Sequence, residues 1–204
     1  MTPEPITTER LTLRPLTAAD DADLLRFRGN ADVARYLSHA PLGPAENTAR
    51  LGRMLAQAGA SSAGWFNVGW AIVLNATGEM IGDARTWNTD SPPAPGTLPA
   101  GSAALGYLLH PDHHGHGFGS EAAAALVHWV FQARGISTVF AGVYEPNLPS
   151  RRLLEGLGFT PDHYFSAVQD RAGKNLPSWR YRLDRPPRNG PASGHNSTPD
   201  QPRR

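Results

Sequence analysis

Cysteine is absent from the 204-residue sequence, which excludes disulfide bonds, thiolate metal sites and a cysteine nucleophile. There is also no apolar N-terminal segment of the signal-peptide type and no run of about eighteen apolar residues. The formal net charge is only +1, so charge gives no reason to expect nucleic acid or an anionic membrane as a partner. We therefore expect a cytoplasmic protein, monomeric or homodimeric, that binds neither nucleic acid nor membrane.

The composition is otherwise that of a globular protein, with 40% hydrophobic and 18% charged residues. The length suits a single domain, which we assign to residues 6–184. A short proline-bearing lead, 1–5, precedes it and is expected to be flexible. Residues 185–204 contain almost no apolar side chains and cannot offset their ordering entropy, so the composition predicts a disordered tail.

A glycine-rich turn, His114–Glu121, is the most informative stretch of the chain. It follows an apolar run, 105–109, and opens an apolar helical pattern, 122–131. The first backbone N–H groups of a helix have no internal partner, and the helix dipole adds positive charge at that end. Glycines let the backbone approach a phosphate closely. The turn therefore predicts a phosphate site, the alternative being a turn that merely connects two elements.

The spacing of the glycines narrows the choice of phosphate-bearing ligand. Gly115, Gly117 and Gly119 do not match the dinucleotide pattern G-x-G-x-x-G, and the turn lacks the lysine of a Walker A loop. The turn is instead similar to the pyrophosphate loop of acetyl-CoA-dependent N-acetyltransferases, Q/R-x-x-G-x-G/A. His114, Gly117 and Gly119 occupy its three defined positions, with His114 in place of the usual Gln or Arg.

Further stretches agree with this resemblance. Residues 105–111 precede the turn, and Asn147–Ser150 and Leu153–Phe159 follow it in the expected order, while Thr8–Pro15 is similar to a first strand. Together they resemble the GNAT superfamily, and within it the RimJ/RimL-like branch that acetylates protein N-termini and related amines. The resemblance extends over about Ile6 to Leu183.

Hydrophobic periodicity and turn residues predict an α/β chain. The expected strands are 11–15, 66–74, 79–87, 103–109, 138–144, 159–169 and 178–183. The expected helices are one that Thr17 caps and Gly29 ends, then 32–37, 46–58, 117–134 and 149–157. The proline-dense stretch 91–99 is expected to be a surface loop, either a simple insertion or a border of the substrate entrance.

The resemblance implies a GNAT fold, a mixed and mostly antiparallel sheet of about seven strands with helices on both faces. Two neighbouring parallel strands, ending at Leu109 and Tyr144, would splay apart. The pantetheine arm of acetyl-CoA would lie between them, bonded by the backbone near Leu108 and Leu109. The pyrophosphate would lie on the turn residues His114, Gly115, His116, Gly117, Phe118, Gly119 and Ser120.

The resemblance also assigns two polar residues after the second of these strands. Asn147 would contact the pantetheine arm, and Ser150 would meet the thioester sulfur as the catalytic residue. Each has a structural alternative, because Asn147 could cap a helix and Ser150 could be a polar residue in its first turn.

The general base is left unassigned. Related enzymes often carry a glutamate at the start of the strand before the loop, where this chain has Ala104. Asp83, Glu79 and His110 are nearby candidates, and an ordered water or an already neutral amine could serve instead.

Two sets of residues, four histidines and three tryptophans, say less about the function. The histidines His110, His113, His114 and His116 form a cluster, but they lie across a turn whose backbone the phosphate site uses, so we predict no metal site. Trp65, Trp70 and Trp87 could line an acceptor pocket, although core packing is expected for at least two of them.

The function that the resemblance implies is transfer of an acetyl group from acetyl-CoA to a primary amine by direct attack in a ternary complex. The acceptor would be a protein N-terminus or a small-molecule amine. Two alternatives stay open: a CoA-binding regulatory module without catalysis, and an acyltransferase that uses a different acyl-CoA.

Overall fold

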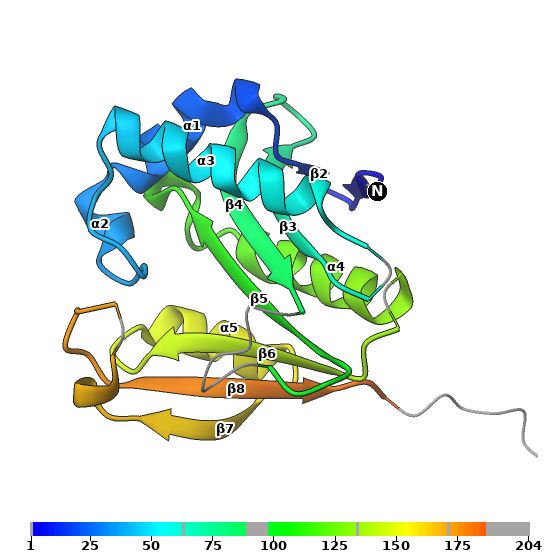
Figure 1. Ribbon diagram of the computed structural model, residues 1–204, viewed down its shortest axis with the longest axis vertical. Helices are drawn as coiled ribbons and strands as arrows, with labels where there is room; N and C mark the ends of the chain where they lie inside the picture. Colours follow the sequence, from blue (N-terminus) through cyan, green and yellow to red (C-terminus); the bar gives the residue numbers. More distant parts are fainter. Residues whose placement is uncertain (1, 63, 89–97, 134, 171, 187–204) are drawn as a thin grey trace, which may run out of the picture.

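A computed structural model describes residues 2–62, 64–88, 98–133, 135–170 and 172–186 (Figure 1). It contains one eight-stranded sheet with the order β1-β2-β3-β4-β5-β6-β8-β7. The strands are β1 (Ile6–Thr7), β2 (Leu11–Pro15), β3 (Asn67–Leu74), β4 (Met80–Trp87), β5 (Ser102–Leu109), β6 (Thr138–Tyr144), β7 (Thr160–Phe165) and β8 (Ser178–Asp184). The sheet has one strand more than predicted, because β1 is two residues long and too short to show periodicity.

The helices match the predicted ones in number and order within the described part of the chain. They are α1 (Asp21–Arg28), α2 (Ala31–Ala34), α3 (Pro44–Gly59), α4 (Phe118–Ala133) and α5 (Leu148–Gly156), with short 3-10 turns at Ala18–Asp20, Pro111–His113 and Ala167–Gln169. The predicted segment 32–37 shortens to the four residues of α2. Helix α3 begins at Pro44, ahead of the expected start at residue 46, because proline suits the first helical position.

Helices cover both faces of the sheet, as predicted. On one face, Leu24 and Phe27 of α1 and Leu51 of α3 pack in one buried cluster with strand residues such as Met80. On the other face, the apolar side of α4 packs against β5 and β2, in a second cluster that also contains residues of β3 and β4. Trp70 of β3 is fully buried there and its indole N–H donates to Thr86 Oγ1, so its role is in the core.

The predicted splayed pair is present. Strands β5 and β6 are the parallel pair, and they pair only over Ser102–Ala104 with Thr138–Phe140. Beyond that point β5 stays with β4 as far as Leu109, and β6 stays with β8 as far as Tyr144 (Figure 1). The carboxyl ends of the two strands therefore diverge and leave backbone groups of both open to a ligand.

Contacts at the C-terminal end of the domain extend slightly beyond its predicted boundary. Arg185, which we had assigned to the tail, donates its backbone N–H to Ser137 O and its guanidinium to Phe131 O. Residues 187–204 of the predicted tail and 91–97 of the proline-dense loop lie outside the described residues. Within the described ranges, no helix is long and apolar enough to cross a membrane.

Candidate active site

The glycine-rich turn has the backbone conformation that its sequence requires. Gly115 and Gly117 have φ angles of +79° and +80°, in the left-handed region that side chains disfavour. The backbone N–H of Glu121 donates to Gly117 O, which is the first helical bond of α4. Among the described residues, no acceptor meets the N–H groups of residues 115–120. They are therefore available for an anion at the positive end of the α4 dipole.

Gly119 is required for packing. A Cβ atom there would lie 3.1 Å from Leu153 Cδ1 and 3.3 Å from Tyr107 Cε2, which is closer than ordinary contact. The glycine thus lets the first turn of α4 approach α5 and β5. This close approach joins the glycine-rich turn to the open end of the splayed pair.

Arg10 and Glu121 fix the glycine-rich turn to the N-terminal strands, and the sequence analysis missed this pair. The Glu121 carboxylate accepts from Thr8 Oγ1, from the Arg10 backbone N–H and from Arg10 Nε, at 2.6, 2.9 and 2.7 Å. Arg10 Nη1 donates to His116 O, and its guanidinium lies 4.8 Å from the centre of the Phe118 ring. Burial alone would raise the pKa of Glu121, but these hydrogen bonds hold it below its ordinary value.

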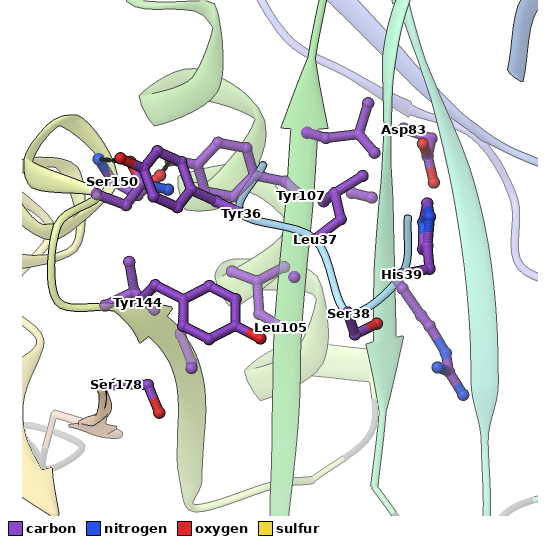
Figure 2. A pocket seen from close by; sticks show the side chains of 18 of the residues that line it. Tyr36, Leu37, Ser38, His39, Asp83, Leu105, Tyr107, Tyr144, Ser150 and Ser178 are labelled. Atoms are coloured by element: carbon purple, nitrogen blue, oxygen red, sulfur yellow. Dashed lines mark hydrogen bonds between the residues drawn. The ribbon is translucent and has the colours of Figure 1, made fainter. Parts of the chain in front are cut away.

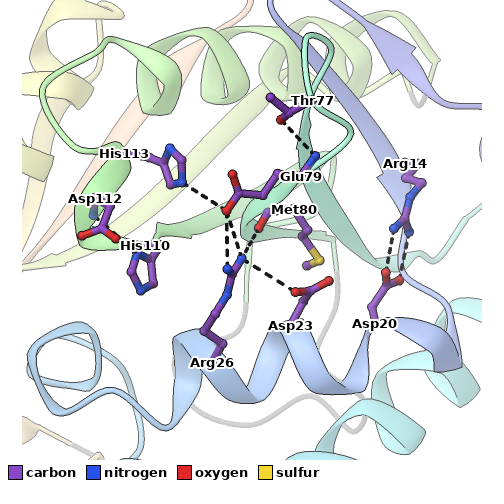
Figure 3. Close-up of polar contacts among 10 residues, drawn as sticks. All are labelled: Arg14, Asp20, Asp23, Arg26, Thr77, Glu79, Met80, His110, Asp112 and His113. Carbon is purple, nitrogen blue, oxygen red and sulfur yellow. Dashed lines mark hydrogen bonds and ion pairs between the residues drawn. The ribbon is translucent and has the colours of Figure 1, made fainter.

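The histidine cluster is dispersed around the turn. His114 Nε2 lies 3.1 Å from Leu109 O and so ties the turn to the end of β5. His113 Nε2 lies 3.6 Å from Glu79, and His110 Nδ1 lies 3.4 Å from Asp112 (Figure 3). His116 stacks on Phe118. In the part of the chain that the structure describes, no three His, Cys, Asp or Glu residues are arranged to hold a metal ion.

A cavity of about 510 Å³ opens beside the diverging strands (Figure 2). Its walls come from α1, the loop between α2 and α3, α3, β4, β5, β6, α5 and the start of β8. Several predicted residues line it, namely Leu108, Asn147, Ser150, Asp83 and Trp87. Ser150 and Tyr107 lie at one end of the cavity, and Asp83 and His39 lie at the other (Figure 2).

Ser150 lies in the first turn of α5 and pairs with Tyr107 of β5. The Tyr107 hydroxyl donates to Ser150 Oγ at 3.3 Å. Burial raises the pKa of Tyr107, partly offset by this hydrogen bond, so the phenol keeps its proton. Because Ser150 Oγ accepts from Tyr107, its own hydroxyl proton is free to be donated to another group.

Asn147 is the N-cap of α5. Its Oδ1 accepts from the Ser150 backbone N–H at 3.3 Å, which is the structural role considered from the sequence. The side-chain NH₂ group of Asn147 is not needed for this cap and can still donate to a ligand in the cavity. Asn147 thus positions Ser150 and borders the cavity itself.

The candidate bases separate into two groups. Glu79 is engaged with Arg26 and His113 outside the cavity lining, and His110 also lies outside it (Figure 3). Asp83 lines the cavity, but its Oδ2 lies 2.6 Å from Arg28 Nη2 in a buried ion pair. Burial raises the pKa of Asp83, against the opposing influence of Arg28. Ala104, at the position of the missing glutamate, lies opposite Trp87 in the β4–β5 pairing.

His39 is a cavity residue that the sequence analysis missed, because nothing in the local sequence marks it. Its Nδ1 lies 2.7 Å from Ala40 O. A carbonyl can only accept, so Nδ1 carries the proton and Nε2 presents a lone pair. Burial lowers the pKa of His39, and the charges of Arg50 and Arg28 lower it further, so the ring is neutral at pH 7. Figure 2 shows this ring pointing toward Asp83.

Two contacts connect the walls across the cavity. The Tyr36 hydroxyl donates to Pro146 O at 3.5 Å, and Lys174 Nζ donates to Ala34 O at 3.0 Å. They join the loop that carries His39 to the segments after β6 and before β8. The two halves of the sheet are thus held together at the open end as well as at the paired end of β5 and β6.

The arrangement suits a thioester of CoA: unbonded N–H groups for phosphates, a divergent strand pair for the pantetheine arm, and hydroxyls where that arm would end. A family model described as an acetyltransferase (GNAT) domain matches residues 10–160. An uncharacterized N-acetyltransferase, p20, from Bacillus licheniformis is 27% identical over 180 residues, covering 88% of this chain and 96% of that protein.

Solved structures agree at the level of the fold. A GNAT-family acetyltransferase from Bacillus anthracis superposes with a TM-score of 0.74 at 16% identity, covering 89% of this chain and 98% of that one. The ribosomal-protein-S5-alanine acetyltransferase from Vibrio fischeri gives a TM-score of 0.70 at 18% identity, covering 89% and 97%. With the family model matching most of its length, the chain belongs to the GNAT acetyltransferase family and is an acetyl-CoA-dependent N-acetyltransferase.

Proposed function

We propose that the enzyme acetylates the primary amine of a protein N-terminus or of a small molecule by direct attack in a ternary complex, as a member of the RimJ/RimL-like branch. One observation carries the proposal: Ser150 and His39 line a single cavity that borders the diverging strands. A group for the leaving thiolate and a group for the amine proton thus face the same space. The name of the Vibrio fischeri relative, a ribosomal-protein-S5-alanine acetyltransferase, supports a protein as the acceptor.

In the proposed step, the amine nitrogen forms a bond to the thioester carbonyl carbon and a tetrahedral oxyanion results. The C–S bond then breaks and the CoA thiolate leaves. Ser150 keeps its proton and donates a hydrogen bond to the sulfur as negative charge develops there, while the Tyr107 hydroxyl, hydrogen-bonded to Ser150 Oγ at 3.3 Å, holds the serine in position. The CoA thiolate then takes up a proton from solvent. No covalent enzyme intermediate is needed, which agrees with the absence of cysteine.

His39 is the proposed acceptor of the amine proton. Its neutral ring presents Nε2, and an imidazole of lowered pKa is a general base that is unprotonated at pH 7. The Asp83 carboxylate, toward which the ring points, stabilises the imidazolium that forms (Figure 2). Asp83 itself is held by Arg28 and serves as a positioning residue.

Turnover with a panel of amines tests the proposal. Purified protein and acetyl-CoA are incubated with peptides that begin with Ala or Ser, with the same peptides blocked at the N-terminus but carrying a lysine, and with small primary amines. Acetylated product by mass spectrometry should match released CoA one to one, and initial-rate lines for the two substrates should intersect. Parallel lines with an acetylated protein would contradict direct attack. Product only with a longer acyl-CoA would contradict acetyl transfer.

A further inference from the structure

The cavity wall opposite Ser150 is unusually rich in arginine. Arg28 of α1, Arg50 of α3 and Arg85 of β4 all line the cavity, and we call these three residues the arginine wall. Asp83 and Asp170 are the acidic residues among the described lining. Asp170 belongs to the opposite side, where its Oδ1 accepts from the Tyr144 hydroxyl and from the Ala172 backbone N–H.

Two of the arginines are already engaged. Arg28 pairs with Asp83 at 2.6 Å, and both side chains are under 10% exposed, so their charges offset each other. Arg85 donates its Nε to Asn67 Oδ1 at 2.7 Å and stacks over the Trp87 ring at 4.9 Å. Arg28 Nη1 is nevertheless buried and lacks a hydrogen-bond partner within the described residues.

Arg50 is different. Its Nε is buried, and the described residues supply neither a hydrogen-bond partner for this atom nor an ion pair for its guanidinium. Burial and the nearby charge of Arg28 lower the pKa of Arg50, although an arginine stays protonated at any physiological pH. Asp83, which pairs with Arg28, offsets only part of the charge of Arg50, so this wall sets one carboxylate against three arginines. The remaining positive charge is unfavourable until an anion binds.

The cofactor does not supply that anion. The phosphates of acetyl-CoA fit the glycine-rich turn, and residues 114–121 are not among those that line this cavity. The pantetheine arm, which leads to the thioester, is uncharged. A guanidinium fork matches a carboxylate or phosphate with two parallel hydrogen bonds, so the missing group is an oxyanion of that kind.

We infer that the amine acceptor of this enzyme carries an anionic group, a carboxylate or phosphate, that binds at Arg50 while the amine lies between His39 and Ser150. The inference rests on the proposed function and specifies its substrate class. The anion comes either from a small amino acid or from an acidic side chain near a protein N-terminus. A polycationic acceptor such as an aminoglycoside is disfavoured by the same wall.

Matched acceptors test the inference. One pair is 6-aminohexanoate and its amide, whose amines have similar basicity, and the other is a peptide beginning Ala-Asp and its Ala-Asn twin. We expect kcat/KM to favour the anionic member by about tenfold or more, equivalent to about 1.4 kcal/mol, in at least one pair. The pair that responds distinguishes a small molecule from a protein N-terminus.

Variants of α3 locate the effect. Assayed at about pH 8, where His39 is neutral with or without the charge of Arg50, Arg50→Gln should abolish the preference by raising KM for the anionic member, with acetyl-CoA affinity kept. Arg50→Lys should restore part of the preference. Arg53→Gln is the matched control, because Arg53 lies on the same helix, is exposed and does not line the cavity. Equal rates for both members of both pairs, or a preference that survives Arg50→Gln, would overturn the inference and leave amine acetylation standing.

A binding measurement tests the anion site at Arg50 independently of whether the enzyme acetylates an amine. Calorimetry with CoA present compares N-acetyl-6-aminohexanoate and its amide in wild type and Arg50→Gln. Tighter binding of the anionic compound in wild type alone, with no turnover of any amine, would support the anion site and overturn the proposed reaction. Equal binding of the two compounds would overturn the anion site whatever the turnover.

Discussion

At the scale of single residues, the proposed mechanism places the hydroxyl pair of Tyr107 and Ser150 beside the leaving group. The direction of their hydrogen bond leaves the serine proton available, and the capping bond from Asn147 sets the position of the serine backbone. If Ser150 acts mainly as charge develops on sulfur, its interaction is stronger in the transition state than in the ground state.

Ser150→Ala is therefore expected to lower kcat by about tenfold to a thousandfold, which overlaps the lower part of the ~10²–10⁴ range that one acid–base group supplies, with little change in the KM for acetyl-CoA. Asn147→Ala should instead weaken acetyl-CoA binding and destabilise α5. Steady-state kinetics with a confirmed acceptor, paired with thermal melts, measures both. A Ser150→Ala enzyme with wild-type kcat would remove the serine from the mechanism.

His39 makes a prediction about pH. A general base works in its neutral form, which dominates above its pKa, and burial has lowered that pKa below the ordinary value of about 6.5. The kcat/KM for the acceptor should thus rise with pH through an inflection below about pH 6.5 and stay level above it. A further rise near the acceptor's own amine pKa is expected in all variants.

His39→Asn should lose the low-pH inflection and fall in rate at pH 7 by about a hundredfold, at the lower end of the contribution of one base. A circular dichroism melt should show it folded, because His39 is only partly buried and contacts its own loop. An inflection that persists in His39→Asn would assign the titration to another group, with Asp83 the next candidate.

At the scale of elements, the strongest local patterns were predicted closely. Strand β6 runs from Thr138 to Tyr144 as expected, and β2 also has the predicted bounds, because β-branched and alternating residues leave little choice there. The short strand β1 was missed because it is defined by its pairing with β2, and two residues are too few to show a strand pattern in the sequence.

The sequence indicated the parts of the candidate site that glycine spacing or the family resemblance marks, including Asn147 and Ser150, which line the cavity. Glycine spacing indicated the glycine-rich turn, because positive φ angles at Gly115 and Gly117 demand glycine. His39 and Arg50 were missed because they reach the cavity from a loop and from α3, whose packing over β3 no local pattern encodes. The role of Arg10 was missed for the same reason, because its contacts with His116 and with Glu121 of α4 arise only in the folded chain.

The glycine-rich turn itself can be tested with a matched pair of substitutions. Gly117→Ala forces a side chain into the left-handed region, at a cost of about 1–2 kcal/mol, and its Cβ would lie 3.4 Å from Arg10 Nη2. Relief of that strain reorients the N–H groups of the turn. We expect calorimetry to show acetyl-CoA binding weakened by about tenfold or more, roughly 1.4 kcal/mol.

Gly78→Ala is the control. Gly78 has a φ of +73° in the hairpin between β3 and β4, with no atom within 4 Å of its would-be Cβ. It should lose similar stability and keep wild-type affinity for acetyl-CoA. Equal affinities in the two variants would dismiss the turn as the phosphate site.

At the scale of the whole molecule, the sheet consists of two parts that meet at three paired positions of β5 and β6. Beyond those pairs, the two parts are connected by α5, by side-chain packing and by the contacts from Tyr36 and Lys174 across the cavity. A ligand that fills the divergence would supply contacts that the strands do not make with each other. Acetyl-CoA should therefore stabilise the fold as well as react.

Acetyl-CoA at about 100 times its Kd should stabilise the folded state by about 2.7 kcal/mol. For a domain of this size each kcal/mol moves Tm by about 2–4 °C, so the expected rise is roughly 5–11 °C. Hydrogen exchange should slow most at the turn, at the open end of β5 (residues 106–109) and in β6 (residues 141–144), beyond the general slowing that stabilisation of the whole fold produces. At the same acetyl-CoA concentration, Gly117→Ala should show a smaller rise, in proportion to its weaker binding. A full rise in Tm with protection confined to the turn would mean that the phosphates bind there but the pantetheine arm does not enter between the strands.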